Sequence, residues 1–381
     1  MSVSDIKIHF NVPYMTGRET DYIKRAVRSG KISGNGIFTK KCQSFFEEKY
    51  GFTKALLTTS CTDALEMAAL LCDVGPDDEV IVPSYTFVST ALAFVRQGAK
   101  IVFADSRSDE PNIDASKIEA LVTPKTKVVV PVHYAGVACD MDAIMDVANR
   151  HNLLVVEDAA QAIDSFYTGK DGVRRPLGSI GHFGCFSFHE TKNIISGEGG
   201  LLAINDERFV SRAEIIWEKG TNRSQFFRGE VNKYGWVDTG SSFLPSEIVA
   251  AFLWAQLEHL DEIQAKRKEH WTKYYEILAQ ISERLGCTLP YIPPYATNNA
   301  HMFYLVFKDL ERRSEFIAYM KERGILAVFH YLSLHASPFY APRHDGRELP
   351  QSDRYSDCLV RLPMFYDLPI DEVVSAIKSF I

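Results

Sequence analysis

The chain has 381 residues, of which 46% are hydrophobic and 24% are charged, an ordinary globular composition with room for two domains. Its net charge of -7 argues against nucleic acid or an anionic membrane as the main partner. No apolar run reaches the roughly 18 residues that span a bilayer, residues 1–10 lack the apolar core of a signal peptide, and the seven scattered cysteines form no CxxC pair. We therefore expect a cytoplasmic protein with reduced thiols.

The first two thirds of the chain alternate strand-like and helix-like patterns. Short apolar runs lie at residues 55–57, 80–82, 101–103, 128–132 and 153–156. Between them, one helical pattern follows Ser60, and others cover residues 87–97 and 140–151. Bulky and β-branched runs with little polar interruption are typical of strands buried on both faces of a parallel sheet. The alternation predicts βαβ units and an α/β fold.

The pattern changes after Gly240. We expect a long amphipathic helix from Pro245 to about residue 281, a loop at 290–299, a strand at 302–307, a helix at 314–323 and a last helix after Pro369. These elements predict a smaller α+β domain. The expected division is a large domain at residues 1–245, which includes the N-terminal segment, and a small C-terminal domain at residues 246–381.

The most informative segment is FGCFSFHETKNIISGEGG at residues 183–200. Its first part is strand-like, the strand breaks before Lys192, and a Gly-rich turn follows at residues 197–200. A lysine in a closed pocket loses solvent, and a nearby cation lowers the pKa of its amine further, so that it can act as nucleophile and base. A surface lysine in a loop is the alternative that the pattern alone leaves open.

A second candidate is an acid at a strand end. The apolar run at residues 153–156 leads directly into Glu157 and Asp158. Ligands of open α/β sheets bind beyond the carboxyl ends of the strands, and an unpaired buried carboxylate is costly. An acid at this position is therefore either solvated or faces a cation, and a protonated pyridine nitrogen is such a cation.

A third candidate is the helix start in LTTSCTDALEMAALL, residues 57–71. Ser60 followed three residues later by Asp63 fits a capping box. The free N–H groups and the dipole at such a helix start suit a phosphate. An ordinary capped helix is the alternative interpretation.

Other kinds of site are not favoured by the sequence. His182, Cys185 and His189 are close in sequence, but in a strand His182 points to the opposite face from the other two, so we expect no metal site. No GxGxxG follows a strand, and there is no P-loop GxxxxGK[ST]. A nicotinamide cofactor and a P-loop nucleotide are therefore not expected.

Taken together, these segments resemble the DegT/DnrJ/EryC1/StrS family of sugar-nucleotide aminotransferases. The matching pieces, in the family's order and spacing, are Ser-Gly-Lys with Ser33-Gly34, TTSCTDALEMA, DEVIVPSYTFVSTA, PVHYAG, VVEDAAQA, SFHETKN with GEGG, and FHYLSLH. The resemblance runs from about residue 10 to the last helix. It implies a fold-type I pyridoxal-phosphate transferase, with a large domain built on a mainly parallel sheet and a smaller α+β C-terminal domain. It also implies pyridoxal 5'-phosphate as cofactor and L-glutamate as amino donor.

The resemblance also implies roles for individual residues. Lys192 matches the lysine that bonds to the cofactor's aldehyde, and Asp158 matches the acid that faces its pyridine nitrogen. Phe87 matches an aromatic side chain stacked on the ring, and Gln161 matches a residue that lines the cofactor. The phosphate contacts that it implies are Cys61, Thr62 and Ser187. His330 falls where the family has a histidine near the sugar.

Two positions depart from the common family pattern. The phosphate turn often reads Ser-Gly-Thr, and here it is Ser60-Cys61-Thr62, which still offers its N–H groups but with less backbone freedom. Many relatives reach across a dimer with an asparagine two residues after a glycine, and here Ser242 follows Gly240 at that spacing. We expect Ser242, or a water molecule, to replace that phosphate contact from the second subunit of a homodimer.

The stretches FHETKN, EKGTNRSQFFRGEV, PVHYAGVACDMD and AVFHYLSLH resemble most closely the members that act on dTDP-4-dehydro-6-deoxyglucose. This implies an amino transfer that gives dTDP-4-amino-4,6-dideoxygalactose, or its glucose epimer, for surface polysaccharide. A sugar-nucleotide 3-aminotransferase is the nearest alternative. A dehydratase of the same family would have histidine at the position of Lys192. A non-catalytic regulator that only binds the cofactor is the alternative from another class, but the chain has no added helix-turn-helix and no basic face.

Overall fold

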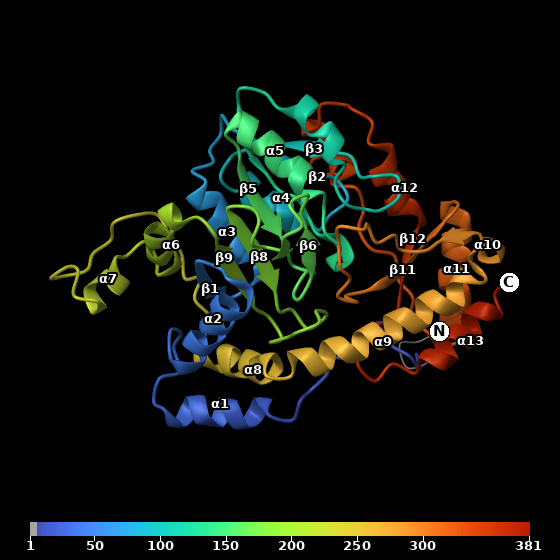
Figure 1. Cartoon of the computed structure of the whole chain (residues 1–381), viewed down its shortest axis with the longest axis horizontal. Coiled ribbons are helices and arrows are strands. Elements are labelled where there is room, and N and C mark those ends of the chain that lie inside the picture. The colour runs from blue at the N-terminus through green and yellow to red at the C-terminus, as the bar shows by residue number, and fades with distance from the viewer. Residues whose placement is uncertain (1–5) are drawn as a thin grey trace.

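The computed structural model describes residues 6–381 and contains a seven-stranded mixed sheet in the order β1-β9-β8-β5-β4-β2-β3 (Figure 1). Its strands are β1 Lys54–Thr58, β2 Glu79–Pro83, β3 Lys100–Ala104, β4 Thr126–Val129, β5 Leu154–Asp158, β8 Phe183–Ser187 and β9 Gly200–Ile204. All strands except β9 share one direction. The carboxyl ends of β1, β5 and β8 therefore meet at the same edge, next to the start of β9.

Helices cover both faces of this sheet, which explains its uninterrupted apolar strands. Alternate strand residues pack into two separate cores, with Leu57 and Val155 on one face and Leu56 and Val156 on the other. The helices of the first face are α1 Glu19–Arg28, α2 Ile37–Tyr50, α5 Met141–His151 and α8 Glu247–Leu257. Those of the second are α3 Cys61–Leu71, α4 Val88–Val95 and α6 Val210–Trp217.

A smaller antiparallel sheet, in the order β10-β11-β12, is formed by the C-terminal part of the chain. Its strands are β10 Cys287–Thr288, β11 Phe303–Phe307 and β12 Leu359–Leu362, and the helices around it are α10 Ser282–Leu285, α11 Leu310–Glu322, α12 Pro350–Cys358 and α13 Ile370–Lys378. Near the other end of the chain, Ile8 forms a bridge with Ile325 beside this sheet. The chain also forms a hairpin of β6 Phe166–Thr168 and β7 Arg174–Pro176, and a short helix, α7 Arg223–Phe227.

The single long helix expected after Pro245 is wrong, because the chain forms two helices, α8 and α9 Leu260–Ala279. At His259 the backbone leaves helical geometry, with φ −109° and ψ 14°. Glu258, just before the break, accepts a hydrogen bond from the Tyr22 hydroxyl at 2.5 Å. The change of direction lets α8 pack against α1 and α2 while α9 continues toward the small sheet (Figure 1).

The other expected helices form close to where the sequence predicts them. α3 begins after Ser60, α5 after Asp140 and α13 after Pro369. Strand β9, which the periodicity did not reveal, is antiparallel to both of its neighbours, so the sheet is mainly rather than wholly parallel. Within residues 6–381, no helix has the length and apolar character that crossing a bilayer requires. The domain boundary at residue 245 stays a prediction.

Candidate active site

A cavity of about 730 Å³ lies at the edge of the large sheet where its parallel strands end, and it reaches residues of β12 in the small sheet. Eight of the residues that the sequence singles out line it: Cys61, Thr62, Phe87, Asp158, Gln161, Ser187, Lys192 and His330. The ninth, Ser242, does not, and lines a different pocket. The fold thus gathers into one space side chains that are far apart in the sequence.

Lys192 lies in the connection between β8 and β9, where its backbone N–H donates to the His189 carbonyl at 2.9 Å. Burial lowers the pKa of the Lys192 amine, and the positive charge of Arg361 acts in the same direction, while the Asp158 carboxylate opposes them. A lowered pKa increases the fraction of neutral amine near pH 7. Lys192 is therefore suited to act as a nucleophile and as a base.

Asp158 is the last residue of β5, and its side chain is 5% exposed. One carboxylate oxygen accepts a hydrogen bond from the Thr90 hydroxyl at 2.7 Å, and the other accepts one from the Ala160 N–H at 3.1 Å. Burial raises the pKa of the Asp158 carboxyl, against the effect of these hydrogen bonds and of the Lys192 charge. A cation opposite Asp158 would stabilise its ionised form.

The neighbouring acid, Glu157, points away from the cavity, because successive strand residues face opposite sides. It is fully buried. Its oxygens accept hydrogen bonds from the N–H groups of Gly178, Ile180 and Gly181 at 2.6–2.8 Å and pair with His133 Nε2 at 2.8 Å. Of the two acids at this strand end, Glu157 holds a loop in place and Asp158 faces the ligand space.

The start of α3 lies at one end of the cavity and is suited to bind an anion. Ser60 Oγ accepts a hydrogen bond from the Asp63 N–H at 3.1 Å, which confirms the predicted helix cap. Within the described chain, the N–H groups of Cys61 and Thr62 have no acceptor, so both are available beside the positive end of the helix dipole. Gly200 packs so closely behind this turn that a Cβ there would lie 2.4 Å from the Ser60 carbonyl.

Phe87 and Gln161 lie along the middle of the cavity. Phe87 precedes α4 and is 55% exposed, so its ring is accessible to a ligand in the cavity. Gln161 accepts a hydrogen bond from the Ala135 N–H at 2.6 Å and donates one to the Tyr331 hydroxyl at 3.0 Å. The Phe87 and Tyr331 rings are 6.1 Å apart. An aromatic ring and a fixed amide therefore border the space between Asp158 and the small sheet.

His330 stacks on Tyr331, with ring centroids 3.5 Å apart, and its Nδ1 pairs with the Tyr134 hydroxyl at 2.7 Å. Burial lowers the pKa of His330 well below its usual value, and the charges of Arg361 and Lys192 act in the same direction. The ring is therefore neutral at pH 7. It can take part in hydrogen bonds to a ligand, but it does not carry a positive charge to one.

Sequence reasoning missed His301 and Arg361, which also line the cavity. His301 Nδ1 pairs with the Asn193 side chain at 2.9 Å, next to Lys192 in the sequence. Arg361 interrupts the apolar run of β12, and a charged residue inside a buried strand is a signal that could have identified it. His301 lies just before β11 and carries no comparable local signal.

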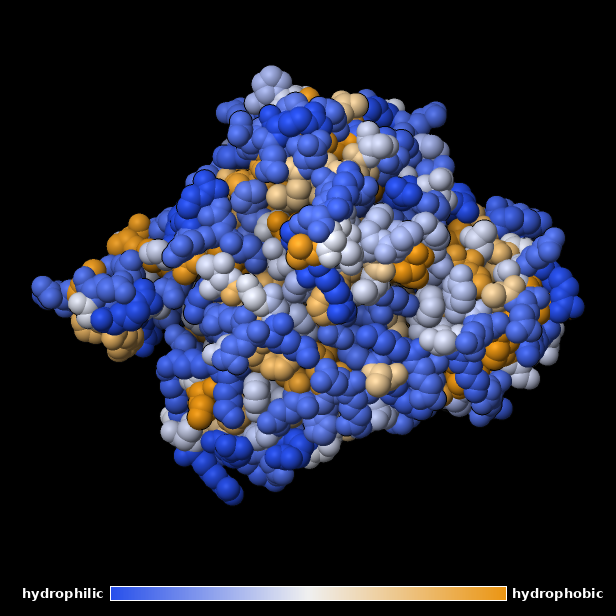
Figure 2. Space-filling view, viewed as in Figure 1, coloured by the Kyte–Doolittle hydropathy of each residue, from blue (hydrophilic) through white to orange (hydrophobic). Residues whose placement is uncertain are grey.

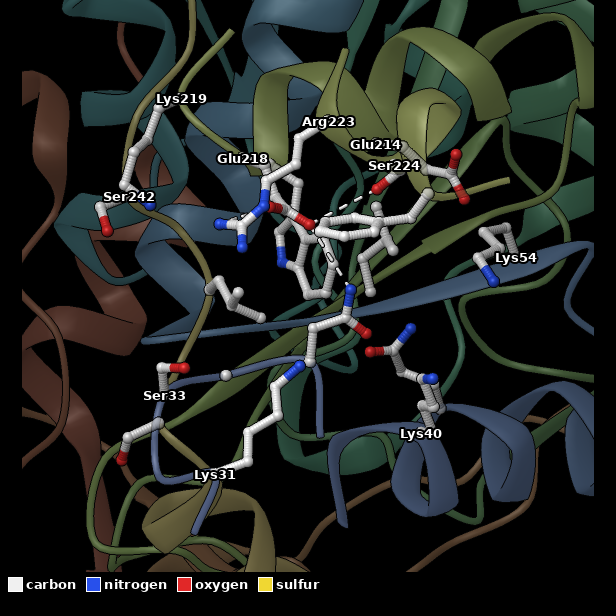
Figure 3. A pocket seen from close by; sticks show the side chains of 18 of the residues that line it. Lys31, Ser33, Lys40, Lys54, Glu214, Glu218, Lys219, Arg223, Ser224 and Ser242 are labelled. Carbon is white, nitrogen blue, oxygen red and sulfur yellow. Dashed lines mark hydrogen bonds and ion pairs between the residues drawn. The ribbon is translucent and has the colours of Figure 1, made fainter. Parts of the chain in front are cut away.

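Ser242 lies in a second pocket of about 970 Å³ between α2, the segment after α6 and the start of α7 (Figure 3). The Ser242 and Lys219 side chains lie on one side of this pocket, and Glu218 lies near its centre, with Arg223 4.0 Å away and Ser224 at 3.4 Å. Lysines 31 and 40 lie on the opposite side. Within one chain, Ser242 does not reach the cavity that holds Lys192.

Comparison with known proteins identifies the family of this chain. The DegT/DnrJ/EryC1/StrS aminotransferase family matches residues 13–380. The chain belongs to this family. It is 32% identical over 384 residues to the spore coat polysaccharide biosynthesis protein SpsC of Bacillus subtilis, covering 98% of this chain and 96% of SpsC. It is 34% identical over 347 residues to GDP-perosamine synthase of Caulobacter vibrioides, covering 89% and 88% of the two chains.

The fold agrees with this assignment. The PLP form of Spr1654 from Streptococcus pneumoniae superposes with a TM-score of 0.87 at 25% identity, covering 97% of each chain. The protein is therefore a pyridoxal-phosphate-dependent sugar aminotransferase of fold type I, with a mainly parallel seven-stranded sheet and a small antiparallel sheet. The predicted fold class, enzyme class and cofactor are confirmed.

The cavity fits pyridoxal phosphate on three observations. Among residues 6–381, two N–H groups at the start of α3 have no acceptor and are available to an anion, and Gly200 leaves no space behind that turn. A buried carboxylate, Asp158, is positioned to face a cation. An amine with a lowered pKa, Lys192, lies in the same cavity. When bound, the cofactor supplies an electron sink for the charge that forms as a C–H bond beside the amino nitrogen breaks.

Proposed function

We propose that the protein transfers the amino group of L-glutamate to C4 of dTDP-4-dehydro-6-deoxyglucose, giving dTDP-4-amino-4,6-dideoxygalactose or its glucose epimer for a surface polysaccharide. The presence of Lys192 and Asp158 in one cavity carries the amino-transfer part of this proposal. The polysaccharide role is supported by the name of its relative SpsC. The sugar is supported by the stretches FHETKN and AVFHYLSLH, which resemble the subgroup that acts on this substrate.

We propose that Lys192 would hold the cofactor through a covalent bond and would be freed from it by the amino donor. As a free amine, Lys192 can accept the proton from the donor carbon that carries the amino nitrogen and can release that proton again. Its lowered pKa supports this role, because the amine must be neutral to accept a proton. Lys192 is the lysine that lines this cavity.

We propose for the other residues the roles that the family resemblance implies, and their positions in the cavity support these roles. The negative charge of Asp158 would stabilise a protonated ring nitrogen, and the Thr90 hydroxyl keeps the Asp158 carboxylate in place. Phe87 packs on the ring face, and Gln161 keeps its position through Tyr331. The phosphate contacts in this proposal are Cys61 and Thr62, through their N–H groups, and Ser187, through its hydroxyl. His330 contacts the sugar, with its orientation set by the Tyr134 hydroxyl.

We propose that the enzyme is a homodimer in which Ser242 of one subunit reaches the cofactor phosphate of the other. Its distance from its own cavity supports this, because within one chain Ser242 lines a different pocket. An arm around α7 projects from the body and carries apolar side chains on its surface (Figures 1 and 2), among them Phe227, 69% exposed, and Trp236, 85% exposed. Side chains this large and apolar are typical of an interface. A fully active enzyme that light scattering shows to be monomeric would contradict this proposal.

We propose that the enzyme acts in the cytoplasm. All seven cysteines are free, and most are buried. This is consistent with a reducing compartment, in which thiols do not pair.

Absorbance spectroscopy of the purified enzyme tests the function. We expect L-glutamate to bleach the band of the lysine-bound cofactor and, after its removal, dTDP-4-dehydro-6-deoxyglucose to restore the band. Bleaching without recovery would mean that another sugar, such as a 3-keto substrate, is used. Absence of the band even after pyridoxal phosphate is added would overturn the role of Lys192.

A further inference from the structure

His301 is held in the cavity wall by the backbone on both sides of its side chain. Ala300, just before it, has a φ of 53°, in the left-handed region that few residues other than glycine adopt. Arg267 of α9 donates to the Ala300 carbonyl at 3.1 Å and to the His301 carbonyl at 2.6 Å. The His301 N–H donates to Asn299 Oδ1 at 3.0 Å. A strained backbone held by this many contacts indicates a side chain whose position matters.

The Asn193 side chain fixes which ring nitrogen of His301 carries a proton. Asn193 Nδ2 donates to Gln264 Oε1 at 2.7 Å and to the Asn299 carbonyl at 2.9 Å. A backbone carbonyl can only accept, so it determines which end of the Asn193 amide faces it. Asn193 Oδ1 therefore faces His301 Nδ1, 2.9 Å away. Because Oδ1 also only accepts, the proton must be on Nδ1.

The other ring nitrogen, Nε2, is a hydrogen-bond acceptor in the cavity. Burial lowers the pKa of His301 well below its usual value, and the charge of Lys192 acts in the same direction. The ring is therefore neutral at pH 7, and with its one proton on Nδ1 it has a free lone pair on Nε2. Within residues 6–381, Nε2 makes no hydrogen bond, and it is accessible from the cavity, which the ring lines.

We propose that His301 Nε2 accepts a hydrogen bond from the substrate hydroxyl on the carbon next to the keto carbon, and this inference rests on the function proposed above. The keto carbon must lie near the Lys192 amine. His301 and Lys192 line the same cavity, and Asn193, the next residue of the chain, binds the His301 ring. In the proposed substrate the donor is the C3 hydroxyl, because C5, the other neighbour of C4, carries a methyl group.

Other partners fit His301 Nε2 less well. It needs a donor, and the carboxylates of L-glutamate have none when they are ionised. In the proposed function, Asp158 takes the ring N–H of the cofactor. The Lys192 amine is also a donor, but it takes part in both half-reactions, whereas a sugar hydroxyl takes part in only one. The two half-reactions therefore distinguish a contact with the sugar from a contact with Lys192.

The test compares two sugars in the half-reaction that consumes them, measured by stopped-flow absorbance. One sugar is dTDP-4-dehydro-6-deoxyglucose, and the other is its 3-deoxy analogue, which lacks only the proposed donor. His301→Phe leaves the hydroxyl without an acceptor, so the second-order rate constant with the first sugar should fall about 10- to 100-fold. With the analogue, His301→Phe and the wild type should agree within about 3-fold. Losses of equal size with both sugars would overturn the proposal.

The half-reaction with L-glutamate separates this role from an action on Lys192. It should change less than about 3-fold in His301→Phe, because L-glutamate has no hydroxyl beside its reacting carbon. Equal losses in both half-reactions would mean that His301 acts through Lys192, and would overturn the assignment to the sugar. A wild type that L-glutamate does not bleach would instead overturn the proposed function.

Asn193→Leu tests the fixed proton. In this variant the His301 ring remains, but either of its nitrogens can carry the proton. The preference for the first sugar over its 3-deoxy analogue should therefore decrease, although less than in His301→Phe. An unchanged preference would overturn the role of Asn193 in fixing the proton.

His270 provides the matched control. It is also a buried histidine that binds a protein oxygen through one ring nitrogen, the Tyr366 carbonyl at 2.9 Å from Nε2, but it does not line the cavity. His270→Phe should leave the preference between the two sugars unchanged. A retained band of the lysine-bound cofactor in His301→Phe establishes that this variant is folded. His301→Gln, which is smaller and can still offer an acceptor, should lose less than His301→Phe with the first sugar and no more with the analogue.

Discussion

The Asp158 carboxylate and the Arg361 guanidinium, on the two walls of the active-site cavity, differ in how completely they are paired. On the large-sheet wall, the Asp158 carboxylate is held by Thr90 and Ala160, and Gln161 is held between Ala135 and Tyr331. On the small-sheet wall, Arg361 makes no side-chain hydrogen bond within the described chain. The Asp158 carboxylate is thus held by the protein itself, whereas the Arg361 guanidinium is available to a bound ligand.

This difference indicates which groups of an active site are best held rigidly by the protein. A group that faces the resident cofactor in every state of the cycle is best held by the protein itself. A group that binds a transient substrate must release it, and a permanent protein partner would compete with that substrate. We expect the residues of the large-sheet wall to control the chemistry and the residues that support this wall to control stability.

The largest effect is expected at Lys192. Lys192→Ala removes the nucleophile and the proton carrier, so turnover should fall by at least about 10³- to 10⁴-fold. Steady-state amino transfer measures this loss. The same variant should keep its thermal unfolding midpoint within a few degrees and should still bind pyridoxal phosphate without a covalent bond. Turnover near the wild-type rate would exclude Lys192 from the chemistry.

A smaller loss is expected at Asp158. Asp158→Asn keeps the shape of the side chain but removes its charge, so kcat should fall about 10²- to 10³-fold, the range seen when one electrostatic contact to the reacting system is removed. Thr90→Val is the matched control, because it keeps the charge and removes only the hydroxyl that donates to it. It should lose about 10-fold or less. Equal losses in the two variants would mean that position, rather than charge, is what Asp158 contributes.

Glu157 should behave in the opposite way to its neighbour. Glu157→Gln places an amide NH₂ among backbone N–H donors from residues 178–181, so we expect a loss of about 3 kcal/mol in the free energy of unfolding. Denaturant titration measures this loss. The rate constant per folded molecule should stay within about 3-fold of the wild type. A large fall in that rate constant with unchanged stability would show that Glu157 belongs to the chemistry as well.

The smallest effect is expected at the junction between the two walls. It is a change in stability that depends on pH. The loop after β3 contacts α12 through the Tyr355 hydroxyl, which donates to the Arg107 carbonyl at 3.1 Å. In this loop, burial raises the pKa of Glu110 from its ordinary 4.5 to about 8, although Arg107 lies 3.3 Å away. The folded state therefore keeps a proton that the unfolded state releases, and the stabilisation from Glu110, full below pH 4.5, is lost as pH rises toward 8.

Glu110→Gln cannot ionise and should remove this dependence. Between pH 5 and 9, the stability of the wild type relative to Glu110→Gln should fall by on the order of 2 kcal/mol, measured by urea unfolding. Asp109→Asn is the control, because pairing with Arg107 lowers the pKa of Asp109, against the effect of burial. Its contribution is lost only as pH falls through that lowered pKa, so it should not change with pH in this range. Parallel curves for wild type and Glu110→Gln would contradict the prediction.

The sequence predicts the large-sheet wall well because its chemistry lies next to strand ends. Asp158 directly follows an apolar run, and Lys192 lies between a strand and a Gly-rich turn, so both positions can be recognised locally. Ser60 could be recognised as a helix cap for the same reason. The fold class also followed, because uninterrupted apolar strands that alternate with helices indicate a sheet buried on both faces.

The other features of the fold and of the site depend on tertiary contacts, which leave little signal in the local sequence. The direction of β9 is set by its pairing with β1 and β8, not by its own periodicity. The break at His259 accompanies the packing of α8 against α1 and α2, whereas the helix-like pattern of the sequence continues through this residue. Arg361 and His301 reach the cavity from the small sheet, and only the folded chain shows that they face Lys192.

Residues near both ends of the chain enclose the cavity. Phe10 and Asn11 line it together with Arg361 and Met364, and the Phe10 carbonyl accepts a hydrogen bond from the Met364 N–H at 3.2 Å. During synthesis on the ribosome, every strand of the large sheet has emerged once Ile204 has left the ribosome. The active site nevertheless closes only after Met364 has emerged. A nascent chain halted before β12 therefore has all the residues of the cofactor-facing wall but no enclosed site in which to use them.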